Sequence, residues 1–258
     1  MPLLRQSPSV SVISERDCCR REFLVRRSPR VAADCAVQRW QPSLMPLASP
    51  ARCGQLSIWT DVDPAHESDF NRWYDREHLQ ERLAIPGFRR ARRFRALGSS
   101  PRPYLALYDT ENLQVFRSPA YQQALERQTG WSLRNFARMC GTQRRVGELS
   151  LDIGQGEGAA LALFVIADVN LVPPDFTSRF EALVARDHVV RASLLRTDVA
   201  LSAPLSATDG PAQADRLVMV EATRHEAAFD AAMVLAQQLC GTDADDVHVF
   251  QALWTLRA

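Results

Sequence analysis

Tyr74 and His78 are the two side chains of this chain best suited to acid–base chemistry. They lie four residues apart, so on a helix they share one face and their side chains can meet. An imidazole with a pKa of about 6.5 exchanges protons near neutral pH, and a neighbouring phenol can donate to an oxygen that gains negative charge. The spacing predicts a proton-transfer site with His78 as acid or base and Tyr74 as donor. The structural alternative is that His78 ends the helix, where the helix dipole favours a cation.

The pair belongs to a pattern that occurs twice. The pattern is Phe, two variable residues, an apolar pair, one variable residue and then Arg, an acid and His. It occurs from Phe70 to His78 and again, 110 residues later, from Phe180 to His188. Self-similarity at a fixed spacing is typical of a duplicated unit. This register places His188 where the first copy has His78. Only the first copy has the aromatic pair Trp73 and Tyr74, so it is the better candidate for a site.

Composition divides the chain into four segments. The first is rich in Arg, Pro and Ser and has no sustained period, which is typical of disorder; the alternative is an over-extended reading frame that precedes Met45. A Gly-rich stretch is typical of a linker. We therefore expect an N-terminal extension, a first module, a linker and a second module at residues 1–50, 52–153, 154–158 and 159–258.

Each module shows the order strand, helix, strand, strand, helix, strand. In the first, apolar alternation and turn residues predict these elements at 55–60, 64–83, 88–97, 104–108, 112–127 and 142–153. In the second they fall at 161–169, 174–187, 190–203, 217–221, 225–239 and 247–256. A βαββαβ unit folds as a ferredoxin-like sandwich with one bare sheet face. The predicted fold class is therefore α+β, with two tandem ferredoxin-like modules whose sheets face each other and enclose a ligand cavity.

Several short motifs of the first module resemble one family. They are Trp59, Asp61-Val-Asp-Pro64, Trp73-Tyr74-x-x-Glu77-His78, Ile85-Pro86-Gly87-Phe88, Ala91-Arg92-Arg93-Phe94 and Ser118-Pro119-Ala120-Tyr121. Together they resemble the EthD-like branch of the dimeric α+β barrel superfamily. The resemblance covers about residues 55–150, and 159–258 by topology and the repeated helix alone.

This resemblance implies a barrel of two ferredoxin-like sheets, here fused in one chain. The superfamily includes polyketide cyclases, decarboxylases, lactone isomerases, cofactor-free oxygenases and haem-binding enzymes. In several of them a His near the end of the first helix points into the barrel as an acid or base. On this sequence that position is His78.

Three further residues are candidates for substrate binding. Trp59 and Trp73 are expected to contribute to the core and to the pocket wall. Strand alternation places Arg90 and Arg92 on one face of their strand and Arg93 on the other. An Arg that faces a covered interior must be paired or bind an anion. Arg93 is therefore a candidate carboxylate clamp, and pairing with a helix carboxylate is the alternative.

Composition excludes several functions. All 31 basic residues are Arg and 30 residues are acidic, giving a net charge of +1, so neither a nucleic-acid nor an anionic-membrane partner is expected. Without Lys there is no Schiff base, pyridoxal-phosphate aldimine or P-loop. The six Cys residues have no C-x-x-C spacing and the His residues no ligand spacing, so no metal site is expected. Since no apolar run reaches the length of a membrane span, a cytoplasmic location is expected.

The leading functional hypothesis is a cofactor-independent enzyme, of cyclase, decarboxylase, isomerase or oxygenase type, that acts on a small apolar or aromatic polyketide-like compound. The first alternative is a non-catalytic module of the same fold that binds a small ligand or a protein. The second is a haem-binding barrel, for which His78 or His188 would be the axial ligand. A homodimer of the fused unit is a candidate assembly, and the sequence leaves the oligomeric state open.

Overall fold

The computed structural model describes residues 53–98, 100–168, 173–204, 211–241 and 244–258. The predicted N-terminal extension, residues 1–50, lies outside these ranges. Within them, no helix is both long and apolar enough to cross a membrane.

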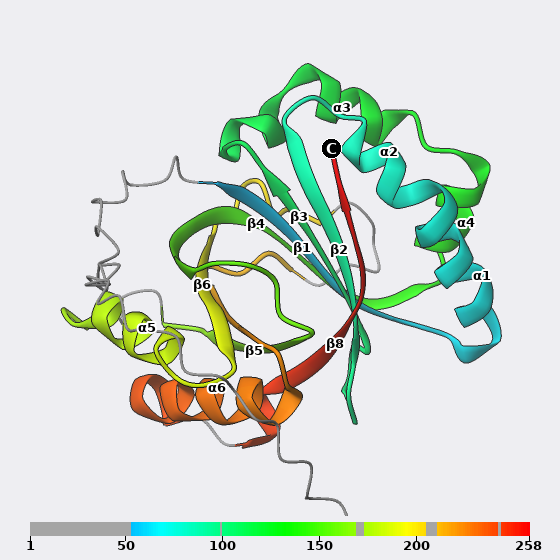
Figure 1. The fold of residues 1–258 in the computed structure, drawn as a ribbon. Coiled ribbons are helices and arrows are strands. Elements are labelled where there is room, and N and C mark those ends of the chain that lie inside the picture. Colours follow the sequence, from blue (N-terminus) through cyan, green and yellow to red (C-terminus); the bar gives the residue numbers. More distant parts are fainter. Residues whose placement is uncertain (1–52, 99, 169–172, 205–210, 242–243) are drawn as a thin grey trace, which may run out of the picture. The chain divides into compact units, whose positions relative to one another are not determined.

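Eight antiparallel strands form one closed barrel in the described part of the chain (Figure 1). The strands of the first half are β1 (Gly54–Val62), β2 (Phe88–Ala96), β3 (Tyr104–Thr110) and β4 (Met139–Gly154). Those of the second half are β5 (Ala160–Ile166), β6 (Val189–Thr197), β7 (Arg216–Ala222) and β8 (His248–Arg257). Around the barrel the order is β1-β3-β2-β8-β5-β7-β6-β4. The predicted α+β fold with a barrel closed by both halves is confirmed.

The two halves order their strands alike. In each half the fourth strand pairs with the first, the first with the third, and the third with the second. The halves meet where β2 pairs with β8 and β4 pairs with β6. The barrel is therefore complete only when both halves are present.

Helices cover the outside of the barrel, with α1 to α4 on one side and α5 and α6 on the other (Figure 1). The first helical segment runs without a break through a 3-10 turn (Pro64–His66), α1 (Glu67–Trp73), a π-helix (Tyr74–His78) and α2 (Leu79–Leu83). The others are a 3-10 helix (Leu113–Arg117), α3 (Pro119–Glu126), α4 (Gly130–Phe136), α5 (Phe176–Val184), α6 (His225–Cys240) and a 3-10 turn (Ala244–Asp246).

Capping residues set where these helices begin. The Asp63 carboxylate accepts from the Ala65 N–H ahead of the first helical segment, and Ser118 caps α3 just before Pro119. Both combine an oxygen acceptor with a proline in the first turn. Helix α4 was not predicted, although Thr129 accepts from the Ser132 N–H at its start in the same way.

Large apolar side chains from all eight strands fill the barrel interior. They are Trp59, Phe94, Leu105, Leu107, Leu149, Leu161, Leu163, Leu195, Leu217, Met219 and Phe250. The expectation that the two sheets enclose a ligand cavity is therefore wrong. An eight-stranded barrel is just wide enough for its inward side chains to fill it or for one small ligand, and here long apolar side chains occupy the interior.

The Arg residues of β2 alternate between the two faces as predicted. Arg92 faces the interior with Phe94, and its Nη1 lies 2.8 Å from Glu221 Oε1 on β7. Arg93 faces the helices, where it pairs with Asp75. Both guanidinium groups are buried, so each meets the requirement that a buried charge be paired.

The sequence repeat does not match the structural register, and the expectation that His188 takes the position of His78 is wrong. His188 lies in the turn before β6 with φ of 69°, and Gly87 lies in the turn before β2 with φ of 92°. The Gly87 carbonyl accepts from Glu111 N (2.8 Å), as the His188 carbonyl accepts from Thr223 N (2.9 Å). His188 is thus the counterpart of Gly87. The first-half helix is longer than α5, so motifs 110 residues apart fall on different positions.

Candidate functional site

A cavity of about 350 Å³ lies between the outer face of the first-half sheet and the helices that cover it. Leu56 and Tyr108 line it from the sheet, and Tyr74, His78 and Phe136 from the helices. Most of the wall is apolar, and no Asp or Glu contributes to it. Apolar pockets with a few convergent polar groups are the usual form of small-molecule sites. The site is thus outside the barrel and not in its interior.

A π-helical turn brings Tyr74 and His78 together. The Leu79 N–H donates to the Tyr74 carbonyl five residues back, which widens the helix by one residue at a kind of turn that is frequent at functional sites. The two rings meet edge to face with centroids 5.1 Å apart. The helix continues to Leu83, so the alternative in which His78 ends the helix is wrong.

His78 is a buried, neutral imidazole. Burial lowers its pKa well below 6.5, and the positive charges of Arg82 and Arg93 lower the pKa further. Phe136 meets the ring edge to face at 5.5 Å. The Nδ1 atom has no hydrogen-bond partner among the described residues. An unpartnered neutral imidazole nitrogen can accept a proton. Nδ1 is covered by protein atoms in this conformation, so a neighbouring side chain must move before a ligand reaches it.

Two buried tyrosines stand beside His78. Burial raises the pKa of Tyr74 and raises that of Tyr108 well above 10, so both phenols stay protonated and can donate. The Tyr108 hydroxyl lies close to that of Tyr74, but has no well-formed hydrogen bond within the described ranges. The cavity therefore offers phenolic donors next to a neutral base.

Trp73 packs against His78 without lining the cavity. It is fully buried, and its Nε1 donates to Ser132 Oγ at 3.0 Å. Its indole lies against His78 with ring centroids 4.3 Å apart, but it does not line the cavity. The structure therefore places Trp73 as a packing partner of His78.

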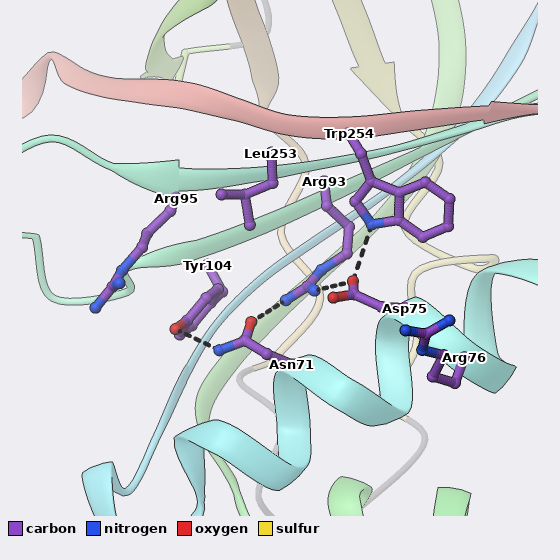
Figure 2. Close-up of a pocket in the computed structure, with 8 residues that line it drawn as sticks. All are labelled: Asn71, Asp75, Arg76, Arg93, Arg95, Tyr104, Leu253 and Trp254. Atoms are coloured by element: carbon purple, nitrogen blue, oxygen red, sulfur yellow. Dashed lines mark hydrogen bonds and ion pairs between the residues drawn. The ribbon is translucent and has the colours of Figure 1, made fainter.

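Arg93 lies on the far side of Tyr74 from the cavity. Figure 2 shows that its Nη1 donates to Asp75 Oδ1 (2.9 Å) and its Nη2 to Asn71 Oδ1 (2.8 Å). Trp254 of β8 also donates to Asp75 Oδ1, at 2.9 Å. The guanidinium stands 4.2 Å from the centre of the Tyr74 ring. Arg93 is thus paired within the protein, which matches the alternative to a carboxylate clamp.

Trp59 is separated from His78 by the sheet. It packs edge to face on His248 and Phe250 inside the barrel, with centroids 4.8 and 6.1 Å away. Its neighbour Ile58 points to the opposite face and lines the cavity. Alternation along β1 therefore places the predicted binding residues Trp59 and His78 on opposite sides of the sheet.

Sequence reasoning missed two buried arginines of the cavity, Arg82 and Arg144. Arg82 Nη2 donates to Gln128 Oε1 at 3.2 Å, and Arg144 Nη2 donates to the Tyr121 hydroxyl at 3.1 Å. Neither forms an ion pair with a carboxylate in the described part of the chain. Arg82 follows His78 by four residues, so the spacing that joined Tyr74 to His78 also pointed to it.

No three His, Cys, Asp or Glu side chains in the described ranges are placed to hold a metal ion. His188, one of the two candidates for an axial haem ligand, is exposed. Its Nδ1 lies 3.1 Å from the Thr223 hydroxyl.

No family model and no curated protein matches this sequence, whereas solved structures match its fold. An anthrone oxidase-like protein is 10% identical with a TM-score of 0.54, over 81% of this chain and 94% of that chain. A monooxygenase-like protein from Fusobacterium nucleatum is 6% identical with a TM-score of 0.50, over 81% of this chain and 96% of that chain. At such identities the similarity shows the fold alone. That fold is the dimeric α+β barrel.

Proposed function

We propose that this protein is a cofactor-independent enzyme that removes a proton from a small apolar or aromatic compound, with His78 as the base. The observation that carries the proposal is a buried, neutral His78 whose Nδ1 has no partner in the described part of the chain, in the wall of an apolar cavity. Buried polar atoms in folded proteins are mostly paired. In the described part of the chain His78 Nδ1 is one of several that have no partner, and it is the one that belongs to an imidazole able to accept a proton.

The reaction follows from the groups around His78. The imidazole takes a proton from a carbon next to a carbonyl, and the electron pair of the C–H bond moves onto the carbonyl oxygen. The Tyr74 phenol, kept protonated by burial, donates to the resulting enolate. Polyketide-like compounds carry such acidic carbons. Cyclisation, isomerisation or reaction with oxygen can each follow from the enolate. Decarboxylation of a 3-oxo acid would instead form such an enolate as CO₂ leaves, and protonated His78 would then return a proton to its carbon.

The structural neighbours are named as oxidase-like and monooxygenase-like proteins, which supports an enzyme that acts on small molecules. The shared strand order of the two halves supports descent from one duplicated ferredoxin-like unit, and the motifs of the first half are what relate that unit to the EthD-like branch. Because His188 is exposed and follows α5 in a turn, the proposal assigns a single site, in the first half.

Anthrone tests the proposal because it carries an acidic CH₂ group opposite its carbonyl. The exchange of these hydrogens in D₂O is followed by NMR with wild-type protein, His78→Gln and the matched control His188→Ala. We expect the wild type and His188→Ala to accelerate exchange, and His78→Gln to lose about 10²-fold or more of the acceleration. Binding without acceleration would indicate a ligand-binding module, and acceleration retained in His78→Gln would place the base elsewhere.

A further inference from the structure

The cavity that contains His78 carries positive charge that forms no ion pair with a carboxylate of the described residues. Arg82 and Arg144 both line it, and their side chains are buried, with 5% and 8% of each residue exposed. None of the residues that line the cavity is acidic. A guanidinium removed from water is costly unless a carboxylate or another anion compensates it.

The nearest carboxylates are engaged elsewhere. Glu77 Oε1 accepts from the Thr129 hydroxyl at 2.6 Å. The Glu81 carboxylate interacts with Ser132 and is near enough to Arg82 to feel its charge, but the two form no ion pair. By contrast, Arg92 and Arg93 each have a carboxylate within 3 Å. The two buried arginines of β2 are thus each paired with a carboxylate, whereas Arg82 and Arg144 of the cavity form no ion pair in the described ranges.

Arg82 donates fewer hydrogen bonds to the protein than Arg144 does. Arg144 donates Nη1 to the Leu201 carbonyl and Nη2 to the Tyr121 hydroxyl, which fixes both ends of its fork. Arg82 donates only Nη2, to Gln128, so its Nη1 has no partner in the described chain. The Nε atoms of both arginines are buried without a partner there and do not distinguish them. Donors of Arg82 therefore remain free beside the proposed base.

We propose that the cavity recognises a carboxylate on its ligand and that Arg82 holds this group. A carboxylate matches the planar guanidinium fork with two parallel hydrogen bonds, and the apolar wall accepts the rest of the molecule. The inference rests on the proposed function and deepens it. The substrate is then an aromatic or otherwise apolar carboxylic acid in its ionised form, held with its acidic carbon near His78.

The test compares ligands that share one ring system and differ in charge. Wild-type protein is titrated at neutral pH with 1-naphthoate, neutral 1-naphthalenemethanol and 1-naphthyl phosphate, and binding is followed by calorimetry. The same titrations are made with Arg82→Gln, with Arg82→Lys, and with Arg72→Gln as a control. Arg72 is on the same helical segment, but its side chain is 69% exposed and pairs with Asp69.

We expect wild-type protein to bind 1-naphthoate about tenfold or more tightly than the alcohol. Arg82→Gln removes this preference with little change for the alcohol, Arg82→Lys restores part of it, and Arg72→Gln keeps it. The wild-type comparison decides the matter even if Arg82→Gln does not fold.

Equal wild-type affinity for the acid and the alcohol would overturn the inference, and tighter binding of the phosphate would overturn the assignment of a carboxylate. A preference that survives in folded Arg82→Gln would show that Arg82 does not hold the charge. If His78-dependent exchange of anthrone is observed alongside equal affinities, the proposed function stands and this inference alone fails. If no naphthalene binds, both the inference and the assignment of the cavity fail.

Discussion

The His78 imidazole lies against the Trp73 indole, with ring centroids 4.3 Å apart and planes tilted by 31°. Trp73 is itself fixed by the hydrogen bond from its Nε1 to Ser132 Oγ (3.0 Å). Since Nδ1 of His78 has no partner in the described ranges, packing on the indole contributes to fixing the plane of the imidazole. Trp73 and His78 are five residues apart, which places them about 140° from each other around a regular α-helix. The wider π-turn between Tyr74 and His78 brings their side chains onto one face.

The depressed pKa of His78 makes stability depend on pH. In the unfolded chain the imidazole binds a proton below a pH of about 6.5, whereas in the folded protein it does so only at lower pH. The stabilisation is therefore complete above about pH 6.5 and is lost as the pH falls toward the folded pKa. Between the two pKa values the loss is at most about 1.4 kcal/mol per pH unit.

His78→Gln should remove this part of the pH dependence. Thermal melts of the variant and the wild type at about pH 7.5 and about pH 5.5 measure it, and the wild type should lose more stability on acidification. His248, whose pKa is also lowered by burial, is present in both proteins and cancels in the comparison. An equal loss in the two proteins would contradict a neutral, buried His78.

Arg82→Met should stabilise the protein while it weakens anion binding. An unpaired buried charge is costly, and an apolar side chain of similar volume removes that cost, so we expect a gain of about 1 kcal/mol in the free energy of unfolding. Chemical denaturation measures it, with Arg72→Met as the exposed control. A loss of more than about 1 kcal/mol would mean that the bond from Arg82 to Gln128 matters more than the unpaired charge.

The ion pair inside the barrel should be essential to stability. Glu221 accepts from Arg92 and also from the Gly158 N–H, at 2.8 and 3.0 Å. Glu221→Gln leaves the buried guanidinium uncompensated, and we expect a loss of about 3 kcal/mol. Glu111→Gln, in the exposed pair with Arg89, should change stability by less than about 0.5 kcal/mol. If Glu221→Gln and Glu111→Gln lost equal amounts of stability in urea denaturation, Glu221 would not be the partner that Arg92 requires.

His188→Gly should raise stability by about 0.5–1 kcal/mol. The residue has φ of 69°, a conformation that costs L-residues about 1–2 kcal/mol, and glycine removes this cost at the loss of the contact with Thr223. Gly87→Ala, at the equivalent turn, should destabilise because the new Cβ would lie 2.6 Å from Val115 Cγ2. Melting temperatures that move in the same direction for both variants would contradict the equivalence of the two turns.

Local features of the sequence determined much of the fold and part of the site. Alternation and turn residues located all eight strands, and Pro64 together with the Pro86-Gly87 turn bounded the helix that contains Tyr74 and His78. The spacing of four residues predicted that these two side chains meet, although the turn that joins them is π-helical and not α-helical. Alternation on β2 likewise separated Arg92 from Arg93.

The position of the cavity and the pairing of charges were decided by tertiary structure. Barrel closure filled the interior with leucine and aromatic side chains, so the site formed under the helices and Trp59 fell on the other side of the sheet. Which arginines met a carboxylate depended on residues distant in the sequence, such as Glu221 for Arg92. The motif that ends in His188 resembles the one that ends in His78 in sequence, but the two lie at different positions in the fold. The reason is that α5 is shorter than the first-half helix, so His188 falls in the turn before β6. Contacts between distant segments are absent from local patterns, and such contacts decide that Arg82 forms no ion pair with any carboxylate of the described residues.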